Sequence, residues 1–405
     1  MPCGAKRVSA PAKARTLCHQ EEKEPAALMR LTEQERGILA GDLGTEGTRM
    51  ALEIVVQAAR LSGADSLVPV EGAHIDGCLY HGVSGTLFAE RLQTAGARVA
   101  VPSTTNVGAL NLLKPDQSRL TGEARKMAYR LMVAHERMGC RPSWTCAGYQ
   151  AGARPRLGQQ VAWGESNAVA FCNSVLGART NRYCEFLDIA CAITGRAPCY
   201  GLHLASNRFA DLVLDVSGLP DAIQASDVFP AVLGALAGVE AGTRVCAVTG
   251  WRVAPDEDAL KAFCAAAAAS GAVGLIHVVG VTPEAPDLDC ALGGVAPRDV
   301  VAVTAAMLAQ TARRLSRAAG PAVDAVALGS PHFSQAECDA LLALAGARAF
   351  KVPVYVCLGR HTLERLRATG KDRKLEDLGV EFVVDTCVVV TPILPQSRGT
   401  LMTNS

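Results

Sequence analysis

The chain has 405 residues, of which 49% are hydrophobic and only 4% are aromatic, and its formal net charge is +1. This length is sufficient for two or three domains with a buried core. The sequence has no apolar run as long as a membrane span and no basic stripe, so we expect neither a membrane nor a nucleic acid as a partner.

The cysteine content is high for a chain of this size, with 15 cysteines that lack the spacing of a disulfide framework. No C-x-x-C pair occurs, which argues against a zinc ribbon or a thioredoxin-like motif. We therefore expect reduced thiols and a cytoplasmic location. Most of these thiols are expected to pack in the core as small hydrophobic side chains.

Residues 1–28 show no periodicity, and we interpret them as a disordered N-terminal extension or as sequence that precedes a start at Met29. Folded structure is expected to begin at Met29, because Thr32 followed by Glu35 is the signature of a capped helix start. A second helix is predicted to end at Gly63. We predict a first α/β lobe over residues 29–215 and a second over 216–405.

In the second half, apolar runs that end in glycine, proline or small polar residues alternate with helical segments. This alternation predicts parallel sheets in an α/β fold. Ligands bind at the carboxyl ends of the strands in such sheets. The rule selects the following strand-end residues: Thr282, Glu284, Ser330, His332, Arg360, Asp385 and Cys387.

The stretch from Trp144 to Arg182 interleaves polar side chains with small and apolar ones. It contains the groups Glu165-Ser166-Asn167 and Arg179-Thr180-Asn181. Such a stretch forms either a satisfied internal network or the wall of a cleft that binds a polar ligand. We favour the cleft because the segment is rich in glycine, which lets the backbone approach a ligand closely.

Three thiols occupy polar or strand-end positions: Cys78, Cys146 and Cys387. Three thiolates suit iron–sulfur clusters, zinc or copper and leave a metal position open to substrate; the alternative is that each is a packed core thiol. His332 lies in a turn context that suits a general acid, and His74 is a second candidate. For both, the alternative is a hydrogen-bonded structural histidine.

The chain resembles the aconitase X family, specifically its large-subunit or catalytic part. The resemblance rests on segments that run in family order: MRLTEQERGILAGDLG, GAHIDGCLYHG, VAVPSTTNVGALNLL, SWTCAGYQAG, VAWGESNAVAF, NSVLGARTNR, AITGRAPCYGLH, GVTPEAP, LGSPHFS and VVDTCVVVTP. It implies an iron- or iron–sulfur-dependent hydro-lyase with an aconitase-like, multi-lobed α/β architecture around a central cleft. It also implies a separate small subunit that carries the swivelling domain and the catalytic base.

Two activities occur in this family, and HIDGCLYHG and GSPHFS resemble the bacterial type that dehydrates cis-3-hydroxy-L-proline to a pyrroline-2-carboxylate. A phosphomevalonate dehydratase large subunit is the alternative. A catalytically silent, truncated metal-binding relative is another, suggested by the end of the chain at LMTNS.

The resemblance also implies roles for individual residues. Cys78, Cys146 and Cys387 would hold the metal, with Cys78 replacing a thiol that other members carry at the position of Ser330. His74, His332 and Glu165 would act in catalysis, with a histidine protonating the leaving hydroxyl. The substrate, a small hydroxy acid, would contact Thr105, Asn106, Ser166, Asn167, Arg179, Thr180, Asn181 and Ser330.

Overall fold

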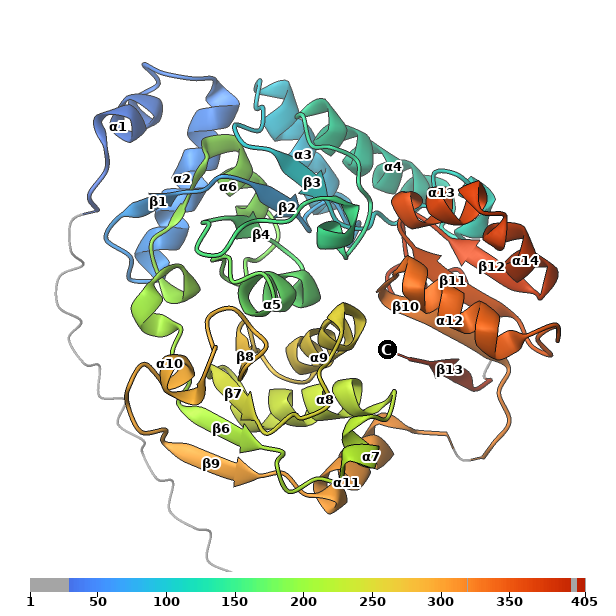
Figure 1. The fold of residues 1–405 in the computed structure, drawn as a ribbon. Helices are drawn as coiled ribbons and strands as arrows, with labels where there is room; N and C mark the ends of the chain where they lie inside the picture. Colours follow the sequence, from blue (N-terminus) through green and yellow to red (C-terminus); the bar gives the residue numbers. More distant parts are fainter. Residues whose placement is uncertain (1–28, 319, 395–398, 405) are drawn as a thin grey trace, which may run out of the picture.

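The computed structural model describes residues 29–318, 320–394 and 399–404. The N-terminal extension predicted for residues 1–28 lies outside them. The described chain forms three regions, residues 29–207, 208–318 and 320–404, and each is built around its own sheets (Figure 1). We refer to them as the first, second and third regions.

The first region begins with α1 (Glu33–Ala40), and the predicted capping box is confirmed: the Thr32 hydroxyl accepts from the Glu35 amide while the Glu35 carboxylate accepts from the Thr32 amide. α2 (Glu46–Leu61) ends two residues before Gly63, close to the predicted position. The other elements are β1 (Leu67–Pro69), β2 (Ala73–Ile75), α3 (Val83–Thr94), β3 (Ser103–Thr105), α4 (Gly122–Arg137), β4 (Ala162–Trp163), α5 (Ser166–Ser174), α6 (Leu187–Thr194) and β5 (Arg196–Pro198), with 3-10 turns η1 (Pro115–Gln117), η2 (Gly148–Ala151), η3 (Gly201–His203) and η4 (Ala205–Asn207).

The main sheet of the first region is parallel, in the order β3-β2-β4, while β1 and β5 form an antiparallel pair. Ile75 of β2 pairs with Thr105 of β3, and His74 of β2 pairs with Trp163 of β4. Three short strands therefore end at the same edge of one sheet. The chain that leaves this edge begins with Asp76 after β2, Asn106 after β3 and Gly164 after β4.

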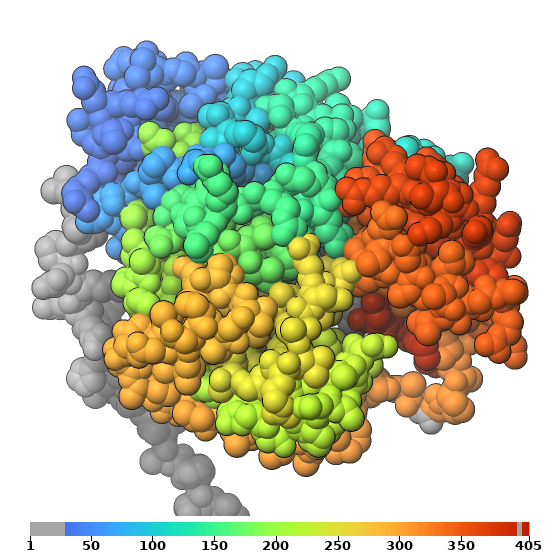
Figure 2. All heavy atoms as spheres, viewed as in Figure 1, coloured from blue at the N-terminus to red at the C-terminus, as the bar shows by residue number. Residues whose placement is uncertain are grey.

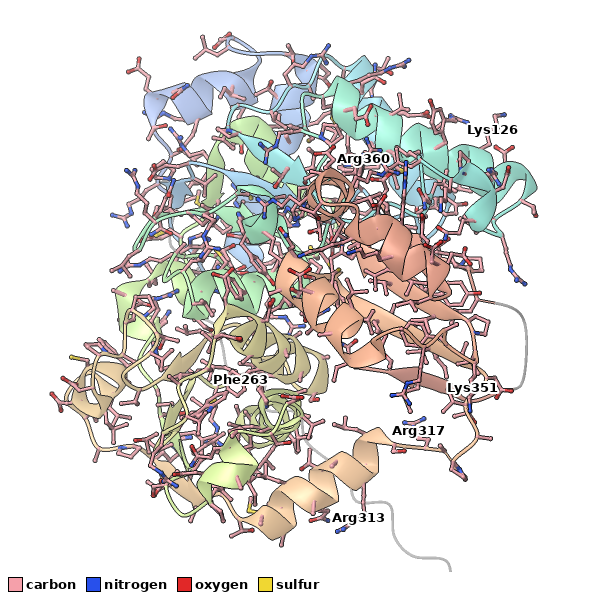
Figure 3. All side chains as sticks on the ribbon, turned by 45° about the vertical axis from the view of Figure 1, so that its right-hand side comes forward. Lys126, Phe263, Arg313, Arg317, Lys351 and Arg360 are labelled. Carbon is pink, nitrogen blue, oxygen red and sulfur yellow. The ribbon has the colours of Figure 1, made fainter. Side chains whose placement is uncertain are left out.

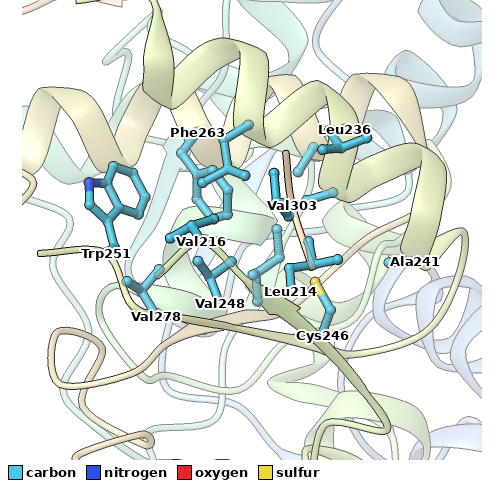
Figure 4. Packing of buried hydrophobic residues seen from close by; sticks show 14 of the residues in the cluster. Leu214, Val216, Leu236, Ala241, Cys246, Val248, Trp251, Phe263, Val278 and Val303 are labelled. Atoms are coloured by element: carbon cyan, nitrogen blue, oxygen red, sulfur yellow. The ribbon is translucent and has the colours of Figure 1, made fainter. Parts of the chain in front are cut away.

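The second region has a parallel sheet in the order β8-β7-β6-β9. Its core packs strand residues against α8 and α9, with Phe263 of α9 lying over Val216 and Val248 (Figure 4). A Cβ atom at Gly234 of α8 would lie 2.3 Å from the Phe263 carbonyl oxygen, so glycine permits the close approach of these two helices. The elements are β6 (Leu212–Asp215), α7 (Asp221–Gln224), α8 (Phe229–Ala241), β7 (Cys246–Thr249), α9 (Glu257–Ser270), β8 (Ile276–Val278), α10 (Leu288–Leu292), β9 (Asp299–Ala302) and α11 (Ala305–Leu315).

The third region is also built on a parallel sheet, in the order β12-β11-β10-β13. Its elements are β10 (Ala325–Phe333), α12 (Gln335–Ala345), β11 (Val354–Leu358), α13 (Arg360–Ala368), α14 (Lys371–Asp377), β12 (Val380–Val383) and β13 (Leu401–Thr403). The predicted α/β class with parallel sheets is confirmed. The predicted lobe of residues 216–405 contains two separate sheets, and a boundary after residue 215 separates β6 from the strands with which it pairs.

Helix α9 joins the three regions, because it packs against α5 of the first region and also contacts β10 of the third. The space-filling view shows the three regions pressed against one another around this helix (Figure 2). At the contact with the third region, the buried Lys261 ammonium donates to Asp258 on its own helix, to the Glu337 carboxylate of α12 and to the His332 carbonyl of β10. The position of β10 relative to the second region thus depends on a buried cation.

Candidate active site

A cavity of about 360 Å³ lies between the first and third regions. One wall comes from the carboxyl ends of β2, β3 and β4 and the beginning of α5, and the facing wall comes from β10 and the loop after β12. Its lining residues are Asp76, Leu79, Asn106, Val107, Cys146, Glu165, Ser166, Asn167, Val169, Arg182, Tyr183, Ser330, Cys387, Val389 and Val390. The sheets thus place the cavity where parallel strands present ligand-binding groups.

The first wall carries two carboxyl groups, each held by an asparagine. The Asn106 side-chain amide donates to Asp76, and the Asn167 side-chain amide donates to Glu165. Glu165 is also the N-cap of α5, where its carboxylate accepts from the backbone amides of Asn167 at 3.2 Å and Ala168 at 2.8 Å. Its φ of +67° is unfavourable for a residue with a side chain, and such strain is concentrated at functional sites.

Burial raises the pKa values of both acids. Loss of solvent, and then the nearby charge of Asp76, raise the pKa of Glu165 to about 7, although the amides of α5 oppose the shift. Burial also raises the pKa of Asp76. Glu165 is therefore a cavity carboxyl that exchanges its proton near neutral pH, which is the property required of a general acid or base.

Asp188 of α6 supports this wall from behind. It is buried, and its Oδ2 accepts from the backbone amides of Asp76 at 2.6 Å and Gly77 at 3.0 Å. Gly164 lies close to both Asp76 and Asp188. A Cβ atom there would come within 2.7 Å of the Asp76 Cβ and 2.9 Å of the Asp188 Oδ2. The glycine before Glu165 therefore allows the ends of β2 and β4 to approach closely.

Two thiols and a hydroxyl also line the cavity: Cys387 and Ser330 on the facing wall, and Cys146 from the loop before η2 of the first region. The Cys146 sulfur accepts from the His332 amide at 3.2 Å, and the Cys387 sulfur accepts from the Val389 amide at 3.3 Å. A hydrogen bond from the buried Cys357 thiol lowers the pKa of Cys387, whereas burial raises the pKa of Cys146. Cys387 thus has the surroundings of a stabilised thiolate, which is the form that binds metals or attacks electrophiles.

His332 joins the two segments that carry these thiols. Its Nε2 lies 3.1 Å from the Thr386 carbonyl oxygen, which only accepts, so Nε2 carries the proton. Its Nδ1 then accepts from the Thr145 hydroxyl at 3.0 Å. Burial lowers the pKa of His332 to about 3, so the ring is neutral. In this position His332 holds the neighbours of Cys146 and Cys387 rather than lining the cavity.

A second fixed point holds the Cys387 loop. Asp385 is fully buried, with a φ of +65°, and the Arg360 guanidinium donates to it in hydrogen bonds of 2.6 and 2.8 Å. Figure 3 labels Arg360 on α13. The same carboxylate accepts from the Leu112 amide of the first region at 3.1 Å. The predicted strand-end residues Arg360 and Asp385 therefore position the loop and do not line the cavity.

The structure does not assemble the predicted trio of metal-binding thiols. Cys78 is fully buried, and its thiol donates to the carbonyls of Ile75 at 3.2 Å and Asn106 at 3.4 Å. Among the described residues, no group of three or more histidine, cysteine, aspartate or glutamate side chains is arranged to hold a metal ion. The cavity offers Cys146 and Cys387, and this pair alone does not make the complete ligand set expected of an iron or iron–sulfur centre.

Several other predicted site residues lie outside the cavity, where most of their side chains form hydrogen bonds with the backbone. The Thr105 hydroxyl accepts from the Trp144 amide, and the Thr180 hydroxyl accepts from the Trp163 amide. Asn181 bonds to the backbone of residues 200 and 202. His74 is fully buried against Thr104, and burial lowers its pKa to about 4.

Arginine 182 reaches the cavity, whereas Arg179 does not line it. The backbone of Arg179 pairs with Gln160 in a bridge. The strand-end residue Glu284 likewise lies elsewhere, in an ion pair with the buried Arg208. Arg179 was predicted to contact the substrate, whereas the arginine of this segment that lines the cavity is Arg182.

The sequence prediction selected Asn106, Cys146, Glu165, Ser166, Asn167, Ser330 and Cys387, which the structure brings together in one cavity. It did not select Asp76, Arg182 or Tyr183. Asp76 follows a predicted strand, so the carboxyl-end rule gave a signal for it. Tyr183 follows the ARTNR segment without a motif of its own, and its hydroxyl donates to the buried His203.

Comparison with known proteins defines the class. Three family models match: the aconitase X first domain over residues 28–206, the second domain over 210–313 and the third domain over 323–405. The chain therefore belongs to the aconitase X family, which confirms the resemblance. The crystal structure of aconitase X from Thermococcus kodakaraensis, in its holo-form, superposes with a TM-score of 0.82 at 31% identity and covers 93% of both chains.

Two relatives are named cis-3-hydroxy-L-proline dehydratase. The one from Pseudomonas aeruginosa is 42% identical and the one from Hypocrea jecorina is 39% identical, each over 93% of this chain. The chain spans 65% and 64% of the lengths of these two proteins. The phosphomevalonate dehydratase large subunit of Methanosarcina mazei is 32% identical, and the match covers 93% of this chain and 90% of that subunit.

No helix in the described ranges is both long and apolar enough to cross a membrane.

Proposed function

We propose that the chain is the catalytic part of a hydro-lyase that removes water from cis-3-hydroxy-L-proline to give a pyrroline-2-carboxylate. The observation that carries the proposal is a cavity in which a carboxyl group with a pKa of about 7 shares one space with an arginine and two thiols. The two relatives named for this activity have 42% and 39% identity to the chain, against 32% for the phosphomevalonate relative from M. mazei.

Dehydration requires the loss of a weakly acidic proton beside a carboxylate and the departure of a hydroxyl group. Among the described residues that line the cavity, Arg182 is the one arginine or lysine. Its guanidinium fork binds the substrate carboxylate and stabilises the charge that develops there as the α-proton leaves. The neighbouring Asp76 disfavours a carboxylate beside it, which favours placement of the substrate carboxylate at the arginine.

Glu165 supplies the proton to the departing hydroxyl. As the C3–O bond breaks, the carboxyl proton moves to the oxygen, and water leaves. The carboxylate that remains keeps its hydrogen bonds from the Asn167 and Ala168 amides at the beginning of α5, where negative charge is favoured. The buried His74 and His332 are less suited to this step because neither lines the cavity.

The base that removes the α-proton is proposed to come from a small subunit. The support is that relatives matched over nearly their whole length are named large subunits, as in M. mazei. An iron or iron–sulfur centre remains part of the proposal, with Cys146 and Cys387 as its cavity-lining ligands; such a centre would supply a Lewis acid for the hydroxyl. Because the arrangement lacks a complete ligand set, no step is derived through it.

The test compares two substrates on the anaerobically iron-treated chain, with and without its small subunit. A cavity with two carboxyl groups and one guanidinium disfavours a phosphate dianion, because extra cations or backbone donors would be needed. We therefore expect formation of a pyrroline-2-carboxylate from cis-3-hydroxy-L-proline and no dehydration of mevalonate 5-phosphate. Preferential turnover of the phosphate ester would contradict the proposal and favour the phosphomevalonate activity.

A further inference from the structure

The carboxyl wall of the cavity contains two buried amide groups with a fixed orientation. Asn106 and Asn167 are 1% and 7% exposed, and each donates its side-chain N–H to a carboxylate. In both pairs the amide nitrogen faces the acid, so the amide oxygen faces away from it. The orientation of each amide is therefore fixed by the acid that it faces.

The oxygens of these two amides have no partner. Neither Asn106 Oδ1 nor Asn167 Oδ1 accepts a hydrogen bond from any described part of the protein. Both residues line the cavity. Buried polar atoms are nearly always hydrogen-bonded, so two orphan acceptors in one cavity wall indicate a ligand that donates.

The charge of the same wall defines the kind of donor. Asp76, which accepts from the Asn106 amide, is an acid of the same wall, and Arg182 lines the same cavity. Acceptor oxygens and carboxyl groups disfavour an anionic group. A neutral hydroxyl has a single O–H and could donate to only one of the two acceptors. A protonated secondary amine carries two N–H donors and a positive charge, which match two acceptors and an acid.

We propose that Asp76, Asn106 and Asn167 bind the ring ammonium of a cyclic α-amino acid, while Arg182 binds its carboxylate. The inference rests on the proposed function, since it names the group by which the site distinguishes an amino acid from an anionic hydroxy acid. A ring nitrogen held in its protonated form also withdraws electrons from the adjacent α-carbon and makes its proton easier to remove. Recognition and activation of the substrate thus depend on the same contact.

The test uses two stable ligands that differ in one ring atom. L-Proline carries the ammonium, and (S)-tetrahydrofuran-2-carboxylate has a ring oxygen in its place and keeps the carboxylate. Binding of each to the full chain is measured by titration calorimetry. We expect L-proline to bind roughly tenfold to a hundredfold more tightly, since hydrogen bonds to a charged group are lost and an acceptor is placed against acceptors.

Substitutions then test whether the preference for L-proline comes from Asp76, Asn106 and Asn167. Asn167→Leu is expected to lower the ratio of the two dissociation constants by about tenfold, the effect of one charge-assisted hydrogen bond. Val169→Ala changes an apolar lining residue and should weaken both ligands together, so the ratio is kept. If Asn167→Leu fails to fold, the affinities of the unmodified chain for L-proline and for the ring-oxygen analogue still test the ammonium site.

Equal affinity for the two ligands, or no binding of L-proline at saturating concentration, would overturn the ammonium site. Turnover of cis-3-hydroxy-L-proline is measured in parallel. Turnover without a preference for L-proline would support the proposed function and contradict the ammonium site. A preference for L-proline without turnover would support the ammonium site and count against the dehydratase.

Discussion

Replacement of Lys261 by methionine tests whether a buried cation joins the second and third regions. The Lys261 side chain is 2% exposed, and its ammonium lies 2.9 Å from Asp258 and also contacts Glu337. Removing one partner of a fully buried ion pair costs about 3–5 kcal/mol. Because the Asp258 and Glu337 side chains keep 23% and 21% of their exposure, we expect a smaller loss, about 2–4 kcal/mol.

The assay is urea unfolding of a double-mutant cycle that combines Lys261→Met with Glu337→Gln. Because the two groups are in contact, the two losses should not add, and a coupling energy above about 1 kcal/mol is expected. Lys371→Met is the control, since its pair with Asp339 is 30% and 40% exposed and should contribute less than about 1 kcal/mol. Additive losses within about 0.5 kcal/mol, or equal effects of Lys261→Met and Lys371→Met, would refute the reasoning.

The remaining predictions concern the cavity. Glu165→Gln should lower kcat by about 10²–10⁴-fold and remove the fall in kcat as pH rises through about 7, which a pH–rate profile checks. The unfolded chain releases the Glu165 proton near its ordinary pKa of 4.5, and the folded chain only near 7, so this group lowers the free energy of unfolding as pH rises across that interval. The Glu165→Gln variant lacks this loss and should therefore gain stability relative to the unmodified chain above about pH 7, as urea unfolding at several pH values would show. Arg182→Gln should raise KM by about tenfold or more, whereas Arg179→Gln, outside the cavity, should leave substrate affinity nearly unchanged; equal effects would contradict the assignment. Cys387→Ser should lose bound iron measured by metal analysis, while Cys172→Ser, in a packed apolar cluster, should retain it.

Local sequence signals predicted much of the fold. The Thr32 capping box and the alternation of strands with helices in the second half are both present, because each depends on neighbours in the chain or on periodicity. The division of the second half into two sheets depends on which strands pair. Pairing between distant strands, as in β6 with β9, leaves no local signal that separates one sheet from two.

The site was predictable where strand ends could be identified, and less so where side-chain direction mattered. Asn106 and Ser330 follow or belong to strands and line the cavity as expected. His74 and His332 also lie on strands, but both side chains are fully buried, and position on a strand does not by itself show which side chains reach the cavity. In the irregular ARTNR segment there is no period to exploit, and the sequence could not distinguish Arg179 from Arg182.

The most direct test of the central claim measures pyrroline-2-carboxylate formation from cis-3-hydroxy-L-proline. The assay compares the anaerobically iron-treated chain alone, the chain with a candidate small subunit, and the Glu165→Gln variant with that candidate subunit. The account predicts product from the unmodified pair and a rate lower by about 10²–10⁴-fold from the variant pair. Absence of product from the unmodified pair with iron bound, or full activity of the Glu165→Gln pair, would contradict it.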